Sequence, residues 1–322
     1  MTMTLKSKMM MLGVLAVFAA GVHAEMLDLA GVDRTVKNVS ELAAYDGVTN
    51  SSEGDPVTLT FTNVTDMVYA GTISGNIRLA KTGVGMLTLS GDNAYTGGTV
   101  IGEYNEQTKK YTVGGRLRAN SLTAFGATSG AITVNCNCQQ ASMASNKVTC
   151  VVFNVADGTF AYPINTSAWP TPGAGPLGSG GQRQYNVAVT AGGVTLSGKI
   201  TGGGLSVHFG GLNWAAKATK VSGTTSMTIS GEIDCADGTC HFGSYAQTIN
   251  ISGKVTTKGV YQTTGTNWPP YWTLSNSGNE IDFIDVGGGA SSAVYLTASG
   301  ANALGGAMVY TTNAISKSIT SG

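Results

Sequence analysis

Residues 229–233 read Ile-Ser-Gly-Glu-Ile, and this short phrase decides the fold because it recurs along the chain. Its pattern is an apolar residue, Ser, Gly, a polar residue and a second apolar residue, and it returns at residues 73–77, 196–200 and 251–255. We interpret each copy as a strand that bends at Ser-Gly and resumes with an apolar side chain facing inward. Recurrence at intervals of about 20–50 residues is typical of a solenoid or an array of repeats.

Alternation of apolar and polar residues dominates the rest of the chain. Residues 57–62, 205–209 and 281–283 each follow this period of two, and Gly-containing turns follow most such runs. The pattern predicts short strands with one face buried and one face in solvent. Strands of this kind can form either a parallel β-helix, in which coils stack along an axis, or an antiparallel β-sandwich.

The spacing of the repeated phrase favours the β-helix. Successive copies begin at residues 196, 229 and 251, whereas the strands of a sandwich recur at a regular spacing of about 8–12 residues. A low charge content also fits stacked coils, because like charges placed directly above one another are destabilising. We therefore predict an all-β parallel β-helix (solenoid), with the antiparallel β-sandwich as the alternative.

The composition excludes several other classes of protein. Only 11% of the 322 residues are charged and 46 are Gly, about twice the usual share, which argues against a helix bundle. With 42% apolar residues the chain can bury a core, so wholesale disorder is excluded as well. The 18 Lys and Arg residues balance 18 Asp and Glu residues, so we expect no nucleic-acid partner.

Residues 1–24 resemble a secretory signal peptide. Lys6 and Lys8 supply positive charge, an apolar run follows over residues 9–21, and a small residue then permits cleavage before Glu25. The run is shorter than the ~20 residues that a bilayer core requires, so we expect no transmembrane segment in the mature chain. This leader predicts export to the cell surface, the outer membrane or the extracellular space.

Export permits disulfides, and the chain contains five cysteines. Cys235 and Cys240 flank an Asp-Gly pair, which is a signal for a two-residue hairpin turn. Such a hairpin would place the two cysteines opposite each other at a separation that suits a disulfide. The alternatives are two free thiols in a loop, or a metal site that includes the adjacent His241.

The other three cysteines leave their pairing open. Cys136 and Cys138 lie on the same face of a predicted strand, and Cys150 lies in a second alternating run. Either of the first two could bridge to Cys150, with the other as a small core residue.

Two stretches interrupt the strands. Residues 103–110 are charged and are predicted to form an exposed hairpin or loop. Residues 163–182 contain four prolines and several glycines and are predicted to be a loop or linker. After the signal peptide we therefore divide the chain into an N-terminal β-helix segment (25–162) and a C-terminal β-helix segment (183–322).

Within residues 71–130 the chain resembles a known family. Residues 81–85 read Lys-Thr-Gly-Val-Gly, residues 87–89 read Leu-Thr-Leu, and residues 93–99 read Asn-Ala-Tyr-Thr-Gly-Gly-Thr. This order resembles the passenger-associated strand repeat of bacterial autotransporters, and residues 296–306 are similar to the phrase that closes that repeat. The resemblance implies a right-handed parallel β-helix on a bacterial surface.

The resemblance also implies local roles. Lys81 would cover an edge of a coil, Gly83 and Gly85 would allow positive φ at the turn, and Tyr95 would lie over a flank. Autotransporters end in a membrane β-barrel, whose strands and aromatic girdles residues 290–322 do not show. We therefore expect either a truncated C-terminal segment or export by another route.

Few residues offer catalytic chemistry. Glu232 with Asp234, and Glu280 with Asp282, each flank an inward apolar residue and would point outward as a pair. Carboxylate pairs can cleave glycosidic bonds. Outward positions of exposed strands are often acidic, however, and no Lys or Arg partner is evident for these pairs. We expect no catalytic site, no metal and no cofactor.

An aromatic group stands at residues 268–272. Trp268, Tyr271 and Trp272 surround two prolines, which would hold the rings stiff and partly exposed. Flat rings in such a place could stack on sugars or on a partner surface. The alternative is a loop folded over the end or flank of the core.

These features predict a secreted or surface-bound bacterial β-helix protein with a structural or adhesive role and no enzymatic activity. Its partners would be host or matrix glycans, or surface proteins. The alternatives are a polysaccharide-cleaving enzyme and a carbohydrate-binding module on the same scaffold.

Overall fold

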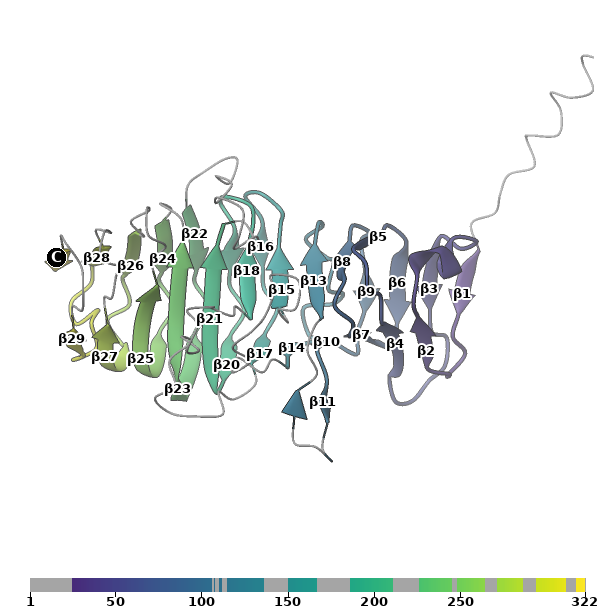
Figure 1. The fold of residues 1–322 in the computed structure, drawn as a ribbon, viewed down its shortest axis with the longest axis horizontal. Coiled ribbons are helices and arrows are strands. Elements are labelled where there is room, and N and C mark those ends of the chain that lie inside the picture. Colours follow the sequence, from purple (N-terminus) through teal and green to yellow (C-terminus); the bar gives the residue numbers. More distant parts are fainter. Residues whose placement is uncertain are drawn as a thin grey trace, which may run out of the picture.

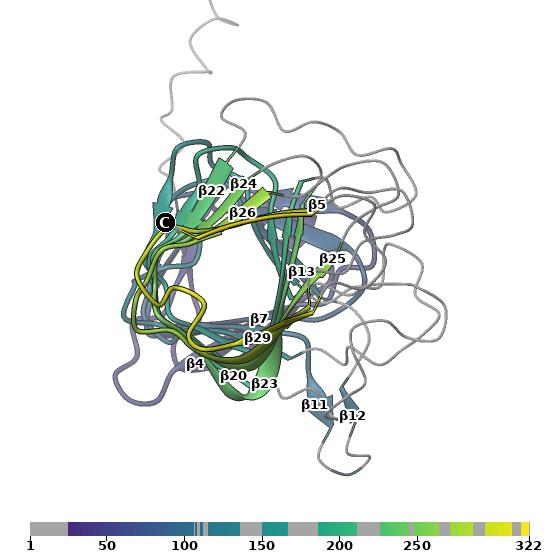
Figure 2. The same ribbon diagram turned by 90° about the vertical axis from the view of Figure 1, so that its left-hand side faces the viewer.

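The computed structural model describes residues 25–105, 107, 110–111, 115–135, 150–166, 186–210, 226–244, 248–263, 271–285, 294–310 and 317–321. This part of the chain forms an elongated parallel β-helix whose coils stack along one axis (Figure 1). Viewed along that axis, the strands of each coil surround a common centre (Figure 2). Every strand pair in the described ranges is parallel except one hairpin. The predicted parallel β-helix is therefore confirmed, and the sandwich alternative is wrong.

The strands form three columns along the axis. The first column starts as a four-stranded sheet and continues as a seven-stranded sheet. The four strands are β1 (Met26–Asp28), β3 (Gly47–Thr49), β6 (Thr72–Gly75) and β9 (Ala94–Tyr95). The seven are β16 (Thr159–Phe160), β19 (Thr195–Leu196), β22 (Ser226–Ile229), β24 (Thr248–Ile251), β26 (Tyr271–Leu274), β28 (Val294–Ala298) and β30 (Lys317–Ser321).

The second and third columns belong to a 17-stranded sheet. The second contains β2 (Arg34–Val36), β4 (Val57–Phe61), β7 (Ile77–Lys81), β10 (Thr99–Ile101), β14 (Ile132–Val134), β17 (Ile164–Thr166) and β20 (Ile200–Gly202). The third contains β5 (Met67–Tyr69), β8 (Met86–Leu89), β13 (Arg116–Ala119), β15 (Cys150–Phe153), β18 (Val187–Val189), β21 (Gly204–Phe209) and β29 (Met308–Tyr310). Three long strands run through both columns, namely β23 (Ile233–Ser244), β25 (Val255–Thr263) and β27 (Glu280–Asp285).

Two short elements complete the described structure. The 3-10 helix η1 (Val39–Leu42) follows β2, and its N-terminus is capped by the side chain of Asn38. The strands β11 (Tyr104–Asn105) and β12 (Lys110–Tyr111) pair antiparallel and project from the rod (Figure 1). This hairpin confirms the prediction made for residues 103–110.

The core lies along the axis of the rod, where inward side chains of successive coils stack in register. One such stack follows the third column, and each of its members is fully buried: Leu87, Leu117, Val151, Val187 and Val207. Burying one aliphatic side chain of this size contributes about 1.5–3 kcal/mol. The alternation seen in the sequence therefore corresponds to a continuous hydrophobic core.

The repeated Ser-Gly phrase forms the corner between the first and second columns. The N–H of Gly231 donates to the carbonyl of Leu196 at 3.1 Å, and the N–H of Gly253 donates to the carbonyl of Ile229 at 3.2 Å. A Cβ atom at Gly231 would collide with the carbonyl oxygen of Gly198 in the preceding coil, and one at Gly253 with that of Gly231. Glycine is required here because the backbones of successive coils approach too closely for any side chain.

Buried asparagines join successive coils. The Oδ1 atom of Asn93 accepts a hydrogen bond from Ile73 N at 2.8 Å, and its Nδ2 atom donates to Ala124 O at 2.7 Å. Asn279 is bonded in the same way to residues one coil before and one coil after it, at 2.9 and 2.7 Å. One side chain thus satisfies buried backbone groups of two neighbouring coils, which leaves neither unpaired.

The predicted linker at residues 163–182 is described only at its start, where β17 occupies residues 164–166. β15, which precedes this range, pairs directly with β18, which follows it. β17, at the start of the range, pairs directly with β20. The division into segments 25–162 and 183–322 remains a prediction. The predicted signal peptide, residues 1–24, lies outside the described residues. Within the described ranges, no helix has the length and apolar character needed to cross a lipid bilayer.

Candidate functional site

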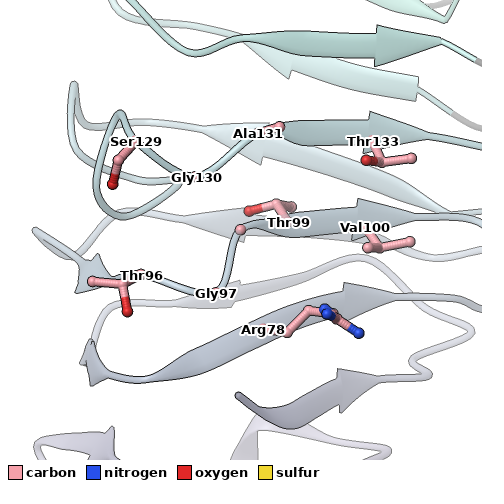
Figure 3. Close-up of a pocket in the computed structure, with 10 residues that line it drawn as sticks. Arg78, Thr96, Gly97, Thr99, Val100, Ser129, Gly130, Ala131 and Thr133 are labelled. Carbon is pink, nitrogen blue, oxygen red and sulfur yellow. The ribbon is translucent and has the colours of Figure 1, made fainter. Parts of the chain in front are cut away.

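A hollow of about 420 Å³ lies on the outer face of the second column, over the coils that contain β7, β10 and β14 (Figure 3). We call it the Arg78 groove. Its lining residues are Arg78, Thr96, Gly97, Gly98, Thr99, Val100, Ser129, Gly130, Ala131 and Thr133. In Figure 3, Arg78, Val100 and Thr133 lie on three successive strands, while Thr96 and Ser129 extend from the turns beside them.

The groove exists because two glycines occupy the coil above Arg78. Leu79 pairs in register with Thr99, so Gly98 stands next to the position of Arg78 and adds no side chain there. Gly98 has φ +77°, a conformation that other residues rarely adopt. A Cβ atom at Gly97 would approach the carbonyl oxygen of Ile77 to 2.7 Å. The Gly-Gly pair that closes the strand repeat is thus required by the turn, and it leaves open space over the guanidinium.

The electrostatic character of the groove is positive and polar. Arg78 is exposed and has no ion-pair partner among the described residues. The Thr96 hydroxyl donates to Asn76 Oδ1 at 3.4 Å, and Ser129 and Thr133 place further hydroxyl groups at the rim. No lining residue is a carboxylate, a histidine or a cysteine. The groove therefore offers hydrogen-bond donors and one cation to a ligand, and no acid–base pair for catalysis.

Sequence reasoning missed this groove. The sequence alone does not distinguish Arg78 from other charged residues, and it indicates Gly97-Gly98 only as part of the strand repeat. The available signal was Gly97-Gly98, about one coil after an exposed arginine. This spacing indicates a groove only when the strand register is known, because the register places Gly98 beside Arg78.

Lys81 lies at the corner between the second and third columns and is buried, so the expectation that it covers an exposed edge is wrong. Its Nζ atom donates to the carbonyl of Gly83 at 2.9 Å and to that of Thr82. Burial, followed by the nearby charge of Arg116, lowers the pKa of Lys81 to about 7, and Asp66 opposes the shift. The lysine therefore holds the turn together from inside.

Other expectations for this repeat are partly confirmed. Gly83 has φ +70°, as predicted, but Gly85 is not among the positive-φ residues. At Gly85 the constraint is space, because a Cβ atom there would reach Thr65 N at 2.7 Å. Tyr95 is fully buried rather than lying over a flank, and its hydroxyl is 2.6 Å from Thr99 Oγ1.

The outward carboxylates of the C-terminal coils are paired with lysines. Lys199 Nζ lies 3.2 Å from Glu232 Oε2 and 3.2 Å from Asp234 Oδ2, and Lys254 Nζ lies 2.6 Å from Glu280 Oε1. The expectation that these acids lack basic partners is wrong for Glu232, Asp234 and Glu280, because a lysine lies one coil away from each, whereas the described ion pairs do not include Asp282. Hydrogen bonding to Asp234 and then Glu232 raises the pKa of Lys199. We call these five ion-paired residues the charge ladder.

Cys235 and Cys240 lie on one continuous strand, β23, so the predicted hairpin between them is wrong. The strand is paired on both sides by parallel neighbours, and the intervening residues form a bulge between Cys235 and Thr239. Both cysteines are fully buried thiols without a disulfide. The hydrogen bond that the Cys235 thiol donates to Cys240, together with burial, raises the pKa of Cys235.

The remaining predictions for cysteine and histidine are only partly accessible. Cys150 is buried in β15, whereas Cys136 and Cys138 lie outside the described residues. His241 is buried beside Thr239 Oγ1, at 3.3 Å from its Nε2 atom. Across the described ranges, no three His, Cys, Asp or Glu side chains gather as they would around a metal ion.

Trp272 belongs to the core, so the interpretation of a partly exposed ring is wrong for this residue. It is 2% exposed and stacks on Phe242 with ring centroids 6.1 Å apart. Its place in β26 pairs in register with Ile249 and Leu296, which are buried as well. Trp268 and the side chain of Tyr271 lie outside the described residues.

Comparison with known proteins gives one match. Residues 79–103 match the family described as Passenger-associated-transport-repeat, which is consistent with an autotransporter passenger repeat. This segment begins within β7 and ends just before the hairpin, and it includes Lys81. Of the residues that line the Arg78 groove, it includes residues 96–100. No curated protein and no solved structure matches the chain.

Proposed function

We propose that this protein is a passenger-type β-helix that is exported to the bacterial surface, where it has a structural or adhesive role. The observation that carries the proposal is the match to the passenger repeat at residues 79–103, within a continuous parallel β-helix. A rod of stacked coils holds surface features at fixed spacing along its length, because each coil pairs in register with the next through its backbone strands.

The predicted signal peptide supports export. Residues 1–24 have the charged start and the apolar run of a leader. N-terminal sequencing of the protein recovered from the producing cells tests this point, and we expect a mature chain that begins at Glu25. Recovery of a chain that keeps residues 1–24 would contradict export by this leader.

Surface location is tested by adding a protease to intact cells that produce the full chain. We expect loss of the protein from intact cells while a cytoplasmic marker survives. A chain that is degraded only after lysis would contradict the proposal. Adhesion is then measured as binding of these cells to immobilised glycans, against cells that lack the protein.

A non-catalytic role is supported by the charge ladder. Glu232, Asp234 and Glu280 are in ion pairs with lysines of the neighbouring coils, so their carboxylate oxygens already have partners within the protein. The quadruple variant Glu232→Gln, Asp234→Asn, Glu280→Gln and Asp282→Asn separates the two roles. We expect it to retain adhesion, and a polysaccharide-cleaving activity that is lost in this variant would contradict the proposal.

A further inference from the structure

The Arg78 groove combines features that suit one kind of ligand. Its volume of about 420 Å³ lies within the range of sites for small molecules, which is roughly 300–1,000 Å³. Arg78 brings a single cation that no described acid neutralises. Thr96, Ser129 and Thr133 add hydroxyl groups that can donate or accept hydrogen bonds.

The lining also argues against other ligands. It contains no aromatic ring, so it offers no platform for stacking a nucleic-acid base. It has no carboxylate to bind a divalent cation. Its apolar surface is limited to small side chains such as Val100 and Ala131, which is too little to hold an apolar anchor of a protein partner.

The guanidinium indicates which charge the ligand carries. Arginine presents its N–H donors in a planar fork that matches a carboxylate with two parallel hydrogen bonds. Because the strand below, β4, places Thr58 next to Arg78 and the coil above places Gly98 there, both neighbours are small and leave the fork accessible. Thr96 and Ser129 lie on the turns beside these strands and offer hydroxyl groups to the rest of such a ligand (Figure 3).

We propose that the Arg78 groove binds a single acidic sugar residue of an extracellular polysaccharide, with its carboxylate paired to Arg78 and its hydroxyls bonded to Thr96, Ser129 and Thr133. The inference rests on the proposed function, since an exported chain meets polysaccharides outside the cell. It adds the site, the chemical class of the ligand and the residues that recognise it.

The test is calorimetric titration of the purified full chain with three probes of equal length. These are an oligomer of galacturonate, a neutral oligomer of galactose and a sulfated oligomer of galactose. We expect the galacturonate oligomer to bind and the neutral oligomer to bind at least about tenfold more weakly, as expected for loss of a charged hydrogen-bonded pair. Equal binding of the neutral probe, stronger binding of the sulfated probe, or no binding of galacturonate would overturn the proposal.

Variants of the lining locate the binding. Arg78→Gln should weaken galacturonate binding by about tenfold or more, and Arg78→Lys should restore only part of it because the ammonium lacks the planar fork. Thr133→Val keeps the shape of the side chain and should weaken binding by a smaller factor. The matched control Lys258→Gln removes an exposed cation elsewhere on the rod and should leave binding unchanged. Equal affinity of Arg78→Gln and the unsubstituted protein would overturn the proposal.

The outcome is separable from that of the proposed function. Galacturonate binding is measured on the purified chain, whereas export is measured by protease accessibility on intact cells. A chain that is exposed on the surface but does not bind galacturonate overturns only the groove. A chain that binds galacturonate but is never exposed overturns the proposed function and leaves the groove as a binding site.

Discussion

The corner between the second and third columns is built in two ways at the two ends of the molecule. In the N-terminal coils β7 and β8 are separate strands, and the turn between them encloses Lys81. In the C-terminal coils β23 and β25 run straight through the corner. There the single O–H group of Thr257 lies within hydrogen-bond distance of two carbonyls, that of Gly238 at 2.9 Å and that of Gly259 at 3.2 Å.

The difference shows that buried carbonyls at this corner can receive hydrogen bonds from either an amine or a hydroxyl side chain. A corner that points carbonyls into the core must supply donors for them, because an unsatisfied buried carbonyl costs about 1–3 kcal/mol. Lys81 supplies the N–H groups of its amine to the carbonyls of Thr82 and Gly83, and Thr257 supplies one O–H group that the carbonyls of Gly238 and Gly259 share. Lys81 lies within residues 79–103, the segment that matches the passenger repeat, whereas Thr257 lies outside it.

The largest effect is expected from filling the close approaches at either corner. A Cβ atom at Gly85 would collide with the backbone of Thr65, and one at Gly238 with the backbone of Gly203. We expect Gly85→Ala and Gly238→Ala each to lower the free energy of unfolding by about 3 kcal/mol, since overpacking against backbone cannot relax easily. Urea denaturation measures the change.

The control for this pair is Gly278→Ala. A Cβ atom there would approach only Asn276 Oδ1, at 3.3 Å, and Gly278 has no positive φ. Its free energy of unfolding should be nearly unchanged. If Gly278→Ala lowered the free energy of unfolding as much as Gly85→Ala, the close approach of neighbouring coils would not be the reason that Gly85 is required.

The next effect comes from removing the donor at each corner. We expect Thr257→Val to lower the free energy of unfolding by about 1–3 kcal/mol, because it keeps the shape of the side chain and removes the buried hydroxyl that hydrogen-bonds at the carbonyls of Gly238 and Gly259. Lys81→Met should have a similar effect at pH 9. Both are measured by urea denaturation at that pH. If either substitution stabilised the protein, the side chain that it replaces would not be a needed hydrogen-bond donor to the carbonyls at that corner.

The two corners should also differ in their response to pH. The pKa of Lys81 is lowered to about 7 from 10.5, so between these values the unfolded chain binds more protons than the folded one. Stability contributed by Lys81 therefore rises as the pH increases from about 7 to about 10.5. The difference between the unsubstituted protein and Lys81→Met should widen over this range, whereas that for Thr257→Val should stay constant. Urea midpoints at several pH values would show this, and a constant difference for Lys81→Met would contradict it.

The smallest effect is expected from the charge ladder. Lys199 and its partners are solvent-exposed, and exposed ion pairs contribute little to stability. Lys199→Ala should change the urea midpoint less than any substitution above, and 1 M NaCl should remove the change through screening. A large, salt-insensitive loss would show that the ladder helps to hold the coils together.

Much of the fold followed from the sequence because a solenoid repeats its local rules. The alternation of apolar residues corresponds to the buried stack through Leu117 and Val151, and the Ser-Gly phrase corresponds to a stacked corner. Both features depend on periodicity within a few residues. They need no knowledge of which coil lies next to which.

The features that escaped prediction depend on neighbouring coils. The Asp-Gly signal between Cys235 and Cys240 favours a hairpin locally, but parallel neighbours pair with β23 both before and after its bulge, β20 and β21 on one side and β25 on the other, and the chain continues in the same direction. Lys199 lies one coil away from Glu232, and the residues near Glu232 in the sequence do not indicate that the two will form an ion pair. The Arg78 groove likewise requires the register that places Gly98 beside Arg78.

The stacking of coils along one axis is tested most directly by distances between spin labels. In a background with all five cysteines replaced by alanine, labels are attached at Thr58 in β4 together with either Thr133 in β14 or Thr201 in β20, all three on the second column. Following the strand pairs, Thr58 and Thr133 are three strand steps apart and Thr58 and Thr201 are five. Thr58 lies two residues out of register with both partners, an offset of about 7 Å along the strand, so at about 4.8 Å per step the separations should be about 16 and 25 Å. Distances that do not grow with the number of steps would contradict the β-helix.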